Sequence, residues 1–237
     1  MKNNKKIIIL LTSAILTVAF VGCSSKSKTT VSKDSDGALK AFNAIVKANP
    51  KSKGYHSALQ HWGFKLPAND KFEWTKDTSA NKIDFAMVIE ADPLIKAGLD
   101  VKKLDPNKWV YKPAEIEGGV QLSNRIIFPY NVSDKKETSN GSEDAFRRVL
   151  EQDPKLIKYM ADEKHYALML GEGNSVHFTE NLGSSDEDME FVFKAEPLIK
   201  AGLDVTKLQG TGFKLEVAGK DNMDSKDDEL VKGYKLK

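Results

Sequence analysis

The chain contains the stretch Ala91-Asp92-Pro93-Leu94-Ile95-Lys96-Ala97-Gly98-Leu99-Asp100-Val101 and repeats it as Ala195-Glu196-Pro197-Leu198-Ile199-Lys200-Ala201-Gly202-Leu203-Asp204-Val205. The two copies, called the signature below, differ only where Asp92 in the first corresponds to Glu196 in the second. A match of this length does not arise by chance. The sequence therefore indicates a tandem duplication.

The signature has the sequence of a short helix that is closed at both ends. Asp92 or Glu196 can cap its start, and the following proline fits the first helical position, where the N–H needs no partner. Gly98 and Gly202 suit the left-handed residue that ends a helix, and the next leucine can make the hydrophobic contact of a Schellman turn. We expect a structural connector, and a binding loop is the alternative.

The flanks of the signature also repeat, at a separation of about 104 residues. Apolar residues at helical spacing predict an amphipathic helix at the start of each repeat, from Phe42, Ile45 and Val46 in the first and from Phe146, Val149 and Leu150 in the second. Just before each signature, residues 84–90 and 188–194 alternate in a way that predicts half-buried strands. The predicted fold class is α+β, with two homologous repeats, each an amphipathic helix packed on an antiparallel sheet, related by pseudo-two-fold symmetry.

Between helix and signature, the two repeats align best when gaps are allowed. His56-Ser57-Ala58-Leu59 resembles His165-Tyr166-Ala167-Leu168. In that alignment the second repeat carries an extra helical stretch at 155–164, and the first carries an insertion at 60–68. Further strands are expected at 72–75, 108–112, 120–128, 176–179, 212–217 and 230–236.

The N-terminus has the pattern of an export signal. Lysines at the start precede an apolar run, Ile7 to Val21, that is short for a membrane span. The residues Phe20-Val21-Gly22-Cys23 then resemble a bacterial lipobox, which implies that Cys23 carries diacylglycerol, with palmitate as a typical chain, and becomes the first mature residue. A plain secretory signal with an incidental cysteine is the alternative.

These features give the expected domain organisation. Residues 1–22 are a lipoprotein signal peptide and 23–37 a disordered tether that is rich in Ser, Lys, Thr and Asp. Repeat one covers 38–128, a linker covers 129–141, and repeat two covers 142–237. Because Cys23 is the only cysteine, the exported part is expected to hold its fold without disulfides.

Charge and composition exclude several classes of partner. The chain has 36 Lys+Arg and 34 Asp+Glu, and removing the signal with Lys2, Lys5 and Lys6 leaves 33 against 34. Only three of the basic residues are arginines, so the Arg-rich patches of nucleic-acid readers are missing and nucleic acid is not expected as a partner. The chain also lacks a nucleophile elbow, a phosphate-binding Gly-rich loop and a His-Glu-x-x-His motif, so no enzyme is expected.

The candidate contact residues are aromatic and histidine side chains. Tyr55, His61, Trp62 and Phe64 lie in or beside the insertion of repeat one, where they form either a ligand or partner contact surface or a cover for the sheet edge.

His56 and His165 occupy matching positions in the gapped alignment. Near a pseudo-two-fold axis they could ligate a transition metal or haem iron together, and two structural histidines are the alternative. His177 aligns with Glu73 and so has no matched partner. The sequence itself assigns no metal and no cofactor.

The lysine-rich, arginine-poor, export-signalled chain resembles surface lipoproteins of low-GC, Clostridium-like Gram-positive bacteria. That resemblance implies a non-enzymatic protein, lipid-anchored to the outer face of the cytoplasmic membrane, that binds or scaffolds at the cell surface, in surface assembly or biofilm formation. Its partners would be other surface proteins or a second copy in a homodimer. The alternative is a solute-binding lipoprotein that holds a small molecule, metal or haem between the repeats.

Overall fold

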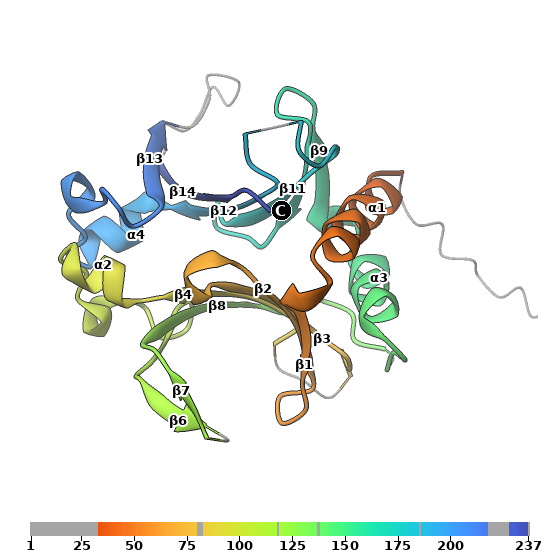
Figure 1. Cartoon of the computed structure of the whole chain (residues 1–237), viewed down its shortest axis with the longest axis horizontal. Helices are drawn as coiled ribbons and strands as arrows, with labels where there is room; N and C mark the ends of the chain where they lie inside the picture. Colours follow the sequence, from red (N-terminus) through yellow and green to blue (C-terminus); the bar gives the residue numbers. More distant parts are fainter. Residues whose placement is uncertain are drawn as a thin grey trace, which may run out of the picture. The chain divides into compact units, whose positions relative to one another are not determined.

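The computed structural model describes residues 33–79, 83–117, 119–136, 138–184, 186–217 and 228–236. Signal peptide, Cys23 and residues 24–32 of the expected tether lie outside them. Within the described ranges the fold is mixed α/β, with four α-helices and two six-stranded antiparallel sheets, as Figure 1 shows. The antiparallel α+β prediction is confirmed at this level. None of the helices in these ranges has the length and apolar character needed to cross a membrane.

The helices fall into a long pair and a short pair. They are α1 (Lys33–Ala48), α2 (Asp92–Lys96), α3 (Ser142–Gln152) and α4 (Ala195–Lys200). Single 3-10 turns are η1 (Pro50–Ser52), η2 (Pro67–Asn69), η3 (Val101–Lys103), η4 (Pro154–Leu156) and η5 (Val205–Lys207).

The two large sheets have the same strand order. Sheet one runs β1 (Lys53–His56), β2 (His61–Lys65), β3 (Lys71–Thr75), β4 (Phe85–Glu90), β8 (Arg125–Tyr130), β5 (Val110–Lys112). Sheet two runs β9 (Ile157–Met160), β10 (His165–Met169), β11 (Ser175–Thr179), β12 (Met189–Lys194), β14 (Asp228–Tyr234), β13 (Phe213–Val217). A separate hairpin, β6 (Glu115–Glu117) with β7 (Val120–Leu122), lies between β5 and β8 in the sequence.

The strand bounds correct the gapped alignment. β1 and β9, β2 and β10, and β3 and β11 each begin 104 residues apart, so no gap is needed. Residues 155–164 are not an added helix, because they form most of η4, β9 and a turn. Residues 60–68 are not an insertion, because they contain β2, which corresponds to β10. His56 therefore corresponds to Met160, and His61 corresponds to His165.

Three predicted boundaries are also wrong. α1 begins at Lys33, so 33–37 are helical rather than part of a disordered tether. Tyr130 is the last residue of β8, so the linker does not begin at 129. The single strand expected at 120–128 is two strands, β7 and β8.

One apolar core fills the space between the sheets. The rings of Phe42 on α1 and Phe146 on α3 are 4.4 Å apart at its centre. Phe42 also contacts Trp74 of sheet one at 5.0 Å and Phe178 of sheet two at 5.2 Å. α1 lies against β9, β10 and β11, whereas α3 lies against β3 (Figure 1). The expectation that each helix covers its own sheet is therefore wrong, because the helices share one core with both sheets.

The signatures contact each other at the opposite end of this core, where α2 and α4 lie side by side (Figure 1). The Asp100 N–H donates to the Ala201 carbonyl at 2.9 Å, and the Asp204 N–H donates to the Ala97 carbonyl at 2.8 Å. Gly98 and Gly202 have φ of 101° and 102°. A Cβ on either would lie 2.9 Å from the other glycine's carbonyl oxygen. Two independent constraints therefore require glycine at both positions.

The structure confirms the predicted C-terminal end of the signature helix but not its predicted N-terminal cap. Leu99 N–H donates to the Leu94 carbonyl and Gly98 N–H to the Ile95 carbonyl, which is the Schellman pattern expected for the C-terminus. The predicted acidic cap is wrong, because neither α2 nor α4 has a side-chain cap. Asp92 instead accepts a hydrogen bond from the Asn124 Nδ2 at 2.6 Å.

Candidate metal centre

A cluster of two histidines and two glutamates lies on the outer face of sheet two. Its members are Glu163, His165, His177 and Glu190, and one ligand atom from each lies within 4.8 Å of the others. On β12, Met189, Phe191 and Phe193 are fully buried in the core, so Glu190 between them points to the other face.

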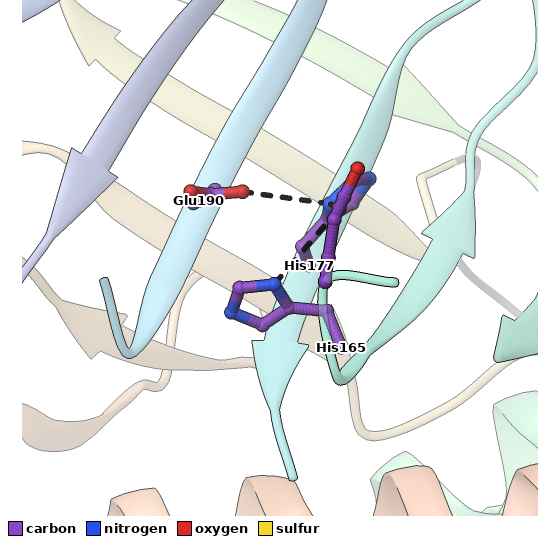
Figure 2. A group of neighbouring side chains, drawn as sticks. His165, His177 and Glu190 are labelled. Atoms are coloured by element: carbon purple, nitrogen blue, oxygen red, sulfur yellow. Dashed lines mark ion pairs between the residues drawn. The ribbon is translucent and has the colours of Figure 1, made fainter. Parts of the chain in front are cut away.

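The register of three neighbouring strands brings the cluster together. His177 on β11 lies directly opposite Glu190 on β12 and opposite Ala167 on β10. His165 is two residues before Ala167, so it lies on the same face, diagonal to His177. Glu163 lies two residues further back, in the turn that leads into β10. Figure 2 shows the three strand residues, His165, His177 and Glu190, converging from adjacent strands.

Three short distances join carboxylate oxygens to the histidine Nδ1 atoms of the cluster. Oε2 of Glu163 is 3.3 Å from Nδ1 of His177 and 3.9 Å from Nδ1 of His165. Oε2 of Glu190 is 3.5 Å from the same Nδ1 of His177, an ion pair drawn in Figure 2. Metal–ligand bonds of about 2.0–2.2 Å place the ligand atoms of a tetrahedral zinc site about 3.3–3.6 Å apart. Two of these three distances fall in that range and the third is 3.9 Å, and all four ligand atoms lie within 4.8 Å of one another.

Both histidines are buried, and each directs its Nδ1 atom toward Glu163. His165 is 4% exposed and His177 is 8% exposed. Nε2 of His165 lies 3.2 Å from the Glu187 carbonyl, and Nε2 of His177 lies 2.9 Å from the Ser175 Oγ. Nδ1 of His165 makes no hydrogen bond, whereas Nδ1 of His177 faces the carboxylates of Glu163 and Glu190. A carbonyl can only accept, so His165 holds its proton on Nε2 and its Nδ1 has a lone pair available for a metal, as metal-ligating histidines do.

Without a metal, the cluster is an ion-pair network. Burial lowers the pKa of His177, but hydrogen bonds and charge from Glu163 and Glu190 outweigh burial and raise it to about 9. The hydrogen bond with His177 lowers the pKa of Glu163. A metal would replace the His177 proton, because a ligating imidazole must be neutral.

The cluster opens into a cavity of about 550 Å³ with an acidic lining. Beyond the cluster, the lining includes Asp186, Glu187, Glu216 and Glu229, with Lys164 as the basic residue. An acidic cleft concentrates cations near its surface. Cations in the cavity can therefore approach Nδ1 of His165 and Nδ1 of His177.

Sheet one does not have the same set of residues. The positions 104 residues before Glu163, His165, His177 and Glu190 are Leu59, His61, Glu73 and Ala86. Nε2 of His61 lies 2.9 Å from the Ile83 carbonyl, as His165 does with Glu187, so this histidine keeps the same backbone contact. Only His61 is the same residue as its counterpart in the cluster. Sheet one therefore offers a position at which a histidine can be changed without touching the cluster.

The residues predicted from the sequence fall into separate places. Phe64 is fully buried in the core, so its prediction as a surface contact is wrong. Tyr55 and Trp62 face each other across β1 and β2 with ring centroids 4.9 Å apart. His56 lies at the end of β1 with its Nε2 3.8 Å from Glu117. His56 and His165 thus belong to different sheets, and the predicted symmetric pair does not form.

Three of the four cluster residues, Glu163, His177 and Glu190, are not among the candidate site residues predicted from the sequence. Glu163 and His165 are two residues apart at the start of a strand, and His177 interrupts the buried pair Val176 and Phe178. This alternation places polar side chains on one face, but it does not show which strands are neighbours. A search for matched histidines also does not select His177, because Glu73 occupies the corresponding position.

In comparisons with known proteins, no family model, no curated protein and no solved structure matches this chain.

Proposed function

We propose that this chain is a non-enzymatic, lipid-anchored extracytoplasmic protein that binds one divalent transition-metal ion, zinc first of all, through Glu163, His165, His177 and Glu190. One observation carries the proposal: two buried imidazoles direct their Nδ1 atoms toward a shared carboxylate of Glu163, and Glu190 faces one of them. Neutral imidazole nitrogens and carboxylate oxygens are the donors that zinc binds, and one ion would contact all four side chains.

The donor set favours zinc over harder cations. Imidazole suits zinc, copper and nickel, whereas calcium and magnesium prefer sites made only of oxygen. Two nitrogens and two carboxylates complete a four-coordinate site and leave no open position for a substrate. This closed set supports a binding role rather than catalysis, and it places the ion on the outer face of sheet two rather than between the repeats.

The fold is proposed to have a pseudo-two-fold axis that passes between the two signatures. The supporting observations are the equal strand order and the exchanged hydrogen bonds of Asp100 and Asp204. A two-fold contact is self-complementary, so each partner gives what it receives. Under this arrangement the scaffold is duplicated, whereas the metal centre belongs to one half.

Calorimetric titration of zinc into the full chain tests the proposed function. We expect one zinc per chain, with the affinity reduced at least about 100-fold by His177→Gln or Glu163→Gln, because each removes a ligand. His61→Gln is the matched control: it changes the histidine at the corresponding position of sheet one and should leave zinc affinity unchanged.

The proposal fails if the native chain binds no zinc, or if His177→Gln and Glu163→Gln bind zinc as tightly as the native chain does. In the first case the cluster is an ion-pair network only.

A further inference from the structure

A second buried polar group lies on the core side of the molecule, away from the metal centre. Asp70, between η2 and β3, is 0% exposed, and Lys232 and Tyr234 on β14 are each 3% exposed. Nζ of Lys232 is in direct contact with Oδ2 of Asp70. The Tyr234 hydroxyl donates to the same Oδ2 at 2.6 Å, and the Glu90 N–H donates to Oδ1 at 2.8 Å.

The surroundings of this group are apolar. The ring centroid of Phe213 is 4.7 Å from Nζ of Lys232, and that of Tyr234 is 5.9 Å away. Nζ makes no hydrogen bond of normal geometry, although an ammonium has three donors. Removing two opposite charges from water costs several kcal/mol for each ion, so burial of this pair is unfavourable unless further contacts compensate for it.

The corresponding positions show that the fold does not require this charge pair. Asn174 corresponds to Asp70, and its Oδ1 accepts the Lys194 N–H at 3.2 Å, which is the same backbone contact that Asp70 makes with Glu90. Phe128, on β8 of sheet one, corresponds to Lys232. An amide and a phenylalanine occupy these two positions, so Asp70 and Lys232 both differ from their counterparts.

We propose that Asp70 and Lys232 form an intramolecular amide bond. The structure presents an amine nitrogen against a carboxyl group, inside a core that no external reagent reaches. A condensation between two side chains of the same chain is the reaction that needs no such access.

The reaction balances without an oxidant or a cofactor. One proton passes from the Lys232 ammonium to Oδ2 of Asp70, and the amine Nζ attacks Cγ while the electron pair of the carbonyl moves to Oδ1, where the Glu90 N–H stabilises the charge. A second proton passes from Nζ to Oδ2 through the Tyr234 hydroxyl, and the electron pair on Oδ1 re-forms the carbonyl. The Cγ–Oδ2 bond breaks, Oδ2 leaves as water, and an Nζ–Cγ amide remains. Burial and the neighbouring Asp70 carboxylate raise the pKa of Tyr234, so its hydroxyl keeps a proton to relay.

Such a bond would tie the start of β3 in sheet one to the last strand of sheet two. Both sheets already share one core, and the amide would add a covalent link between them at a point where the charge pair would otherwise be buried.

Mass spectrometry of the purified full chain tests this proposal. A tryptic digest should contain peptides 66–71 and 227–235 joined, with the mass of their sum less one water, and no cleavage after Lys232. Lys232→Arg keeps the positive charge but cannot form this amide, so its digest should contain peptide 66–71 unlinked, with cleavage after residue 232 giving 227–232 and 233–235. Lys232→Met removes the amine and gives a second control that needs no buried charge.

Tyr234→Phe separates the relay from the fold. We expect it to slow the condensation about 100-fold, the usual range for a positioned proton-transfer group, so that freshly made protein is mostly unlinked. If the native chain gives peptides 66–71, 227–232 and 233–235 separately, each with its full sequence mass, the group is an ionic contact and the proposal is overturned.

Discussion

His177 lies between two carboxylates with almost no access to solvent, and this arrangement makes it the most strongly perturbed histidine in the described structure. Its charge is stabilised by Glu163 and Glu190 more than burial disfavours it. The same contacts would hold the neutral ring against a metal ion. One side chain can therefore serve as an ion-pair partner without metal and as a ligand with it.

This arrangement predicts a pH dependence of stability in the metal-free chain. The pKa of His177 rises from 6.5 when unfolded to about 9 when folded, so the stabilisation is complete below pH 6.5 and is lost as the pH rises through 9. We expect the destabilisation caused by His177→Gln to be greatest near about pH 6 and to shrink by up to about 3 kcal/mol by about pH 10.

Urea unfolding of both proteins in the presence of a chelator measures this difference. A destabilisation that stays the same across the pH range would show that Glu163 and Glu190 do not stabilise a charged His177.

Single residues also show which parts of the candidate site could be predicted from the sequence and which could not. The expectation of an export signal with a lipidated cysteine could be drawn from the sequence because it rests on a local pattern. His165 could be selected from the sequence, but His177 and Glu190 could not be joined to it. They lie 12 and 25 residues further along the chain and come together only through the register of β10, β11 and β12.

At the scale of elements, the signature forms a turn that contacts its own copy. The exchanged hydrogen bonds and the close approach of Gly98 and Gly202 explain why these residues match between the copies. Most of the signature helix could be predicted from the sequence, because proline and glycine act locally. The contact between the two copies could not, since it depends on how the halves meet.

Alanine at either glycine should destabilise the fold by about 1–3 kcal/mol, because the backbone has positive φ and the new Cβ would meet the opposite carbonyl. Under the proposed two-fold arrangement, Gly98→Ala and Gly202→Ala should cost the same. Gly54→Ala is the control, since nothing lies within 4 Å of its Cβ position. Chemical unfolding gives the three values, and unequal costs at Gly98 and Gly202 would contradict the two-fold arrangement.

The elements also explain the failed alignment. His56 and His165 share a local pattern with the residues that follow them, and that similarity favoured gaps. The strands keep a constant separation instead, because each must pair along its length with its neighbours. Apolar residues at 156–160 suited a helix or a strand equally, and a run this short does not distinguish them.

At the scale of the whole molecule, the described residues 33–236, with their gaps, have one core built by both halves. Phe42 and Phe146 meet at its centre, and each contacts Trp74 of sheet one and Phe178 of sheet two. The mixed fold class with antiparallel sheets could be predicted from the sequence, whereas the packing of α1 against sheet two could not. Periodicity shows which face of a helix is buried, but not which sheet covers it.

The outer faces of the two sheets differ in their side chains. Sheet two has the two histidines and two glutamates of the candidate centre, whereas sheet one has Leu59, His61, Glu73 and Ala86 at the corresponding positions. Function on this scaffold is therefore proposed to lie where the halves diverge and not in the signature that they share.

Anomalous diffraction at the zinc edge, from crystals of the full chain grown with zinc, would show whether the cluster holds the ion. We expect one strong peak on the outer face of sheet two, about 2.0–2.2 Å from Nδ1 of His165, Nδ1 of His177 and one oxygen each of Glu163 and Glu190. His61 should have no peak beside it. An empty map at the cluster, or a zinc ion that touches none of these four side chains, would rule out the proposed metal centre.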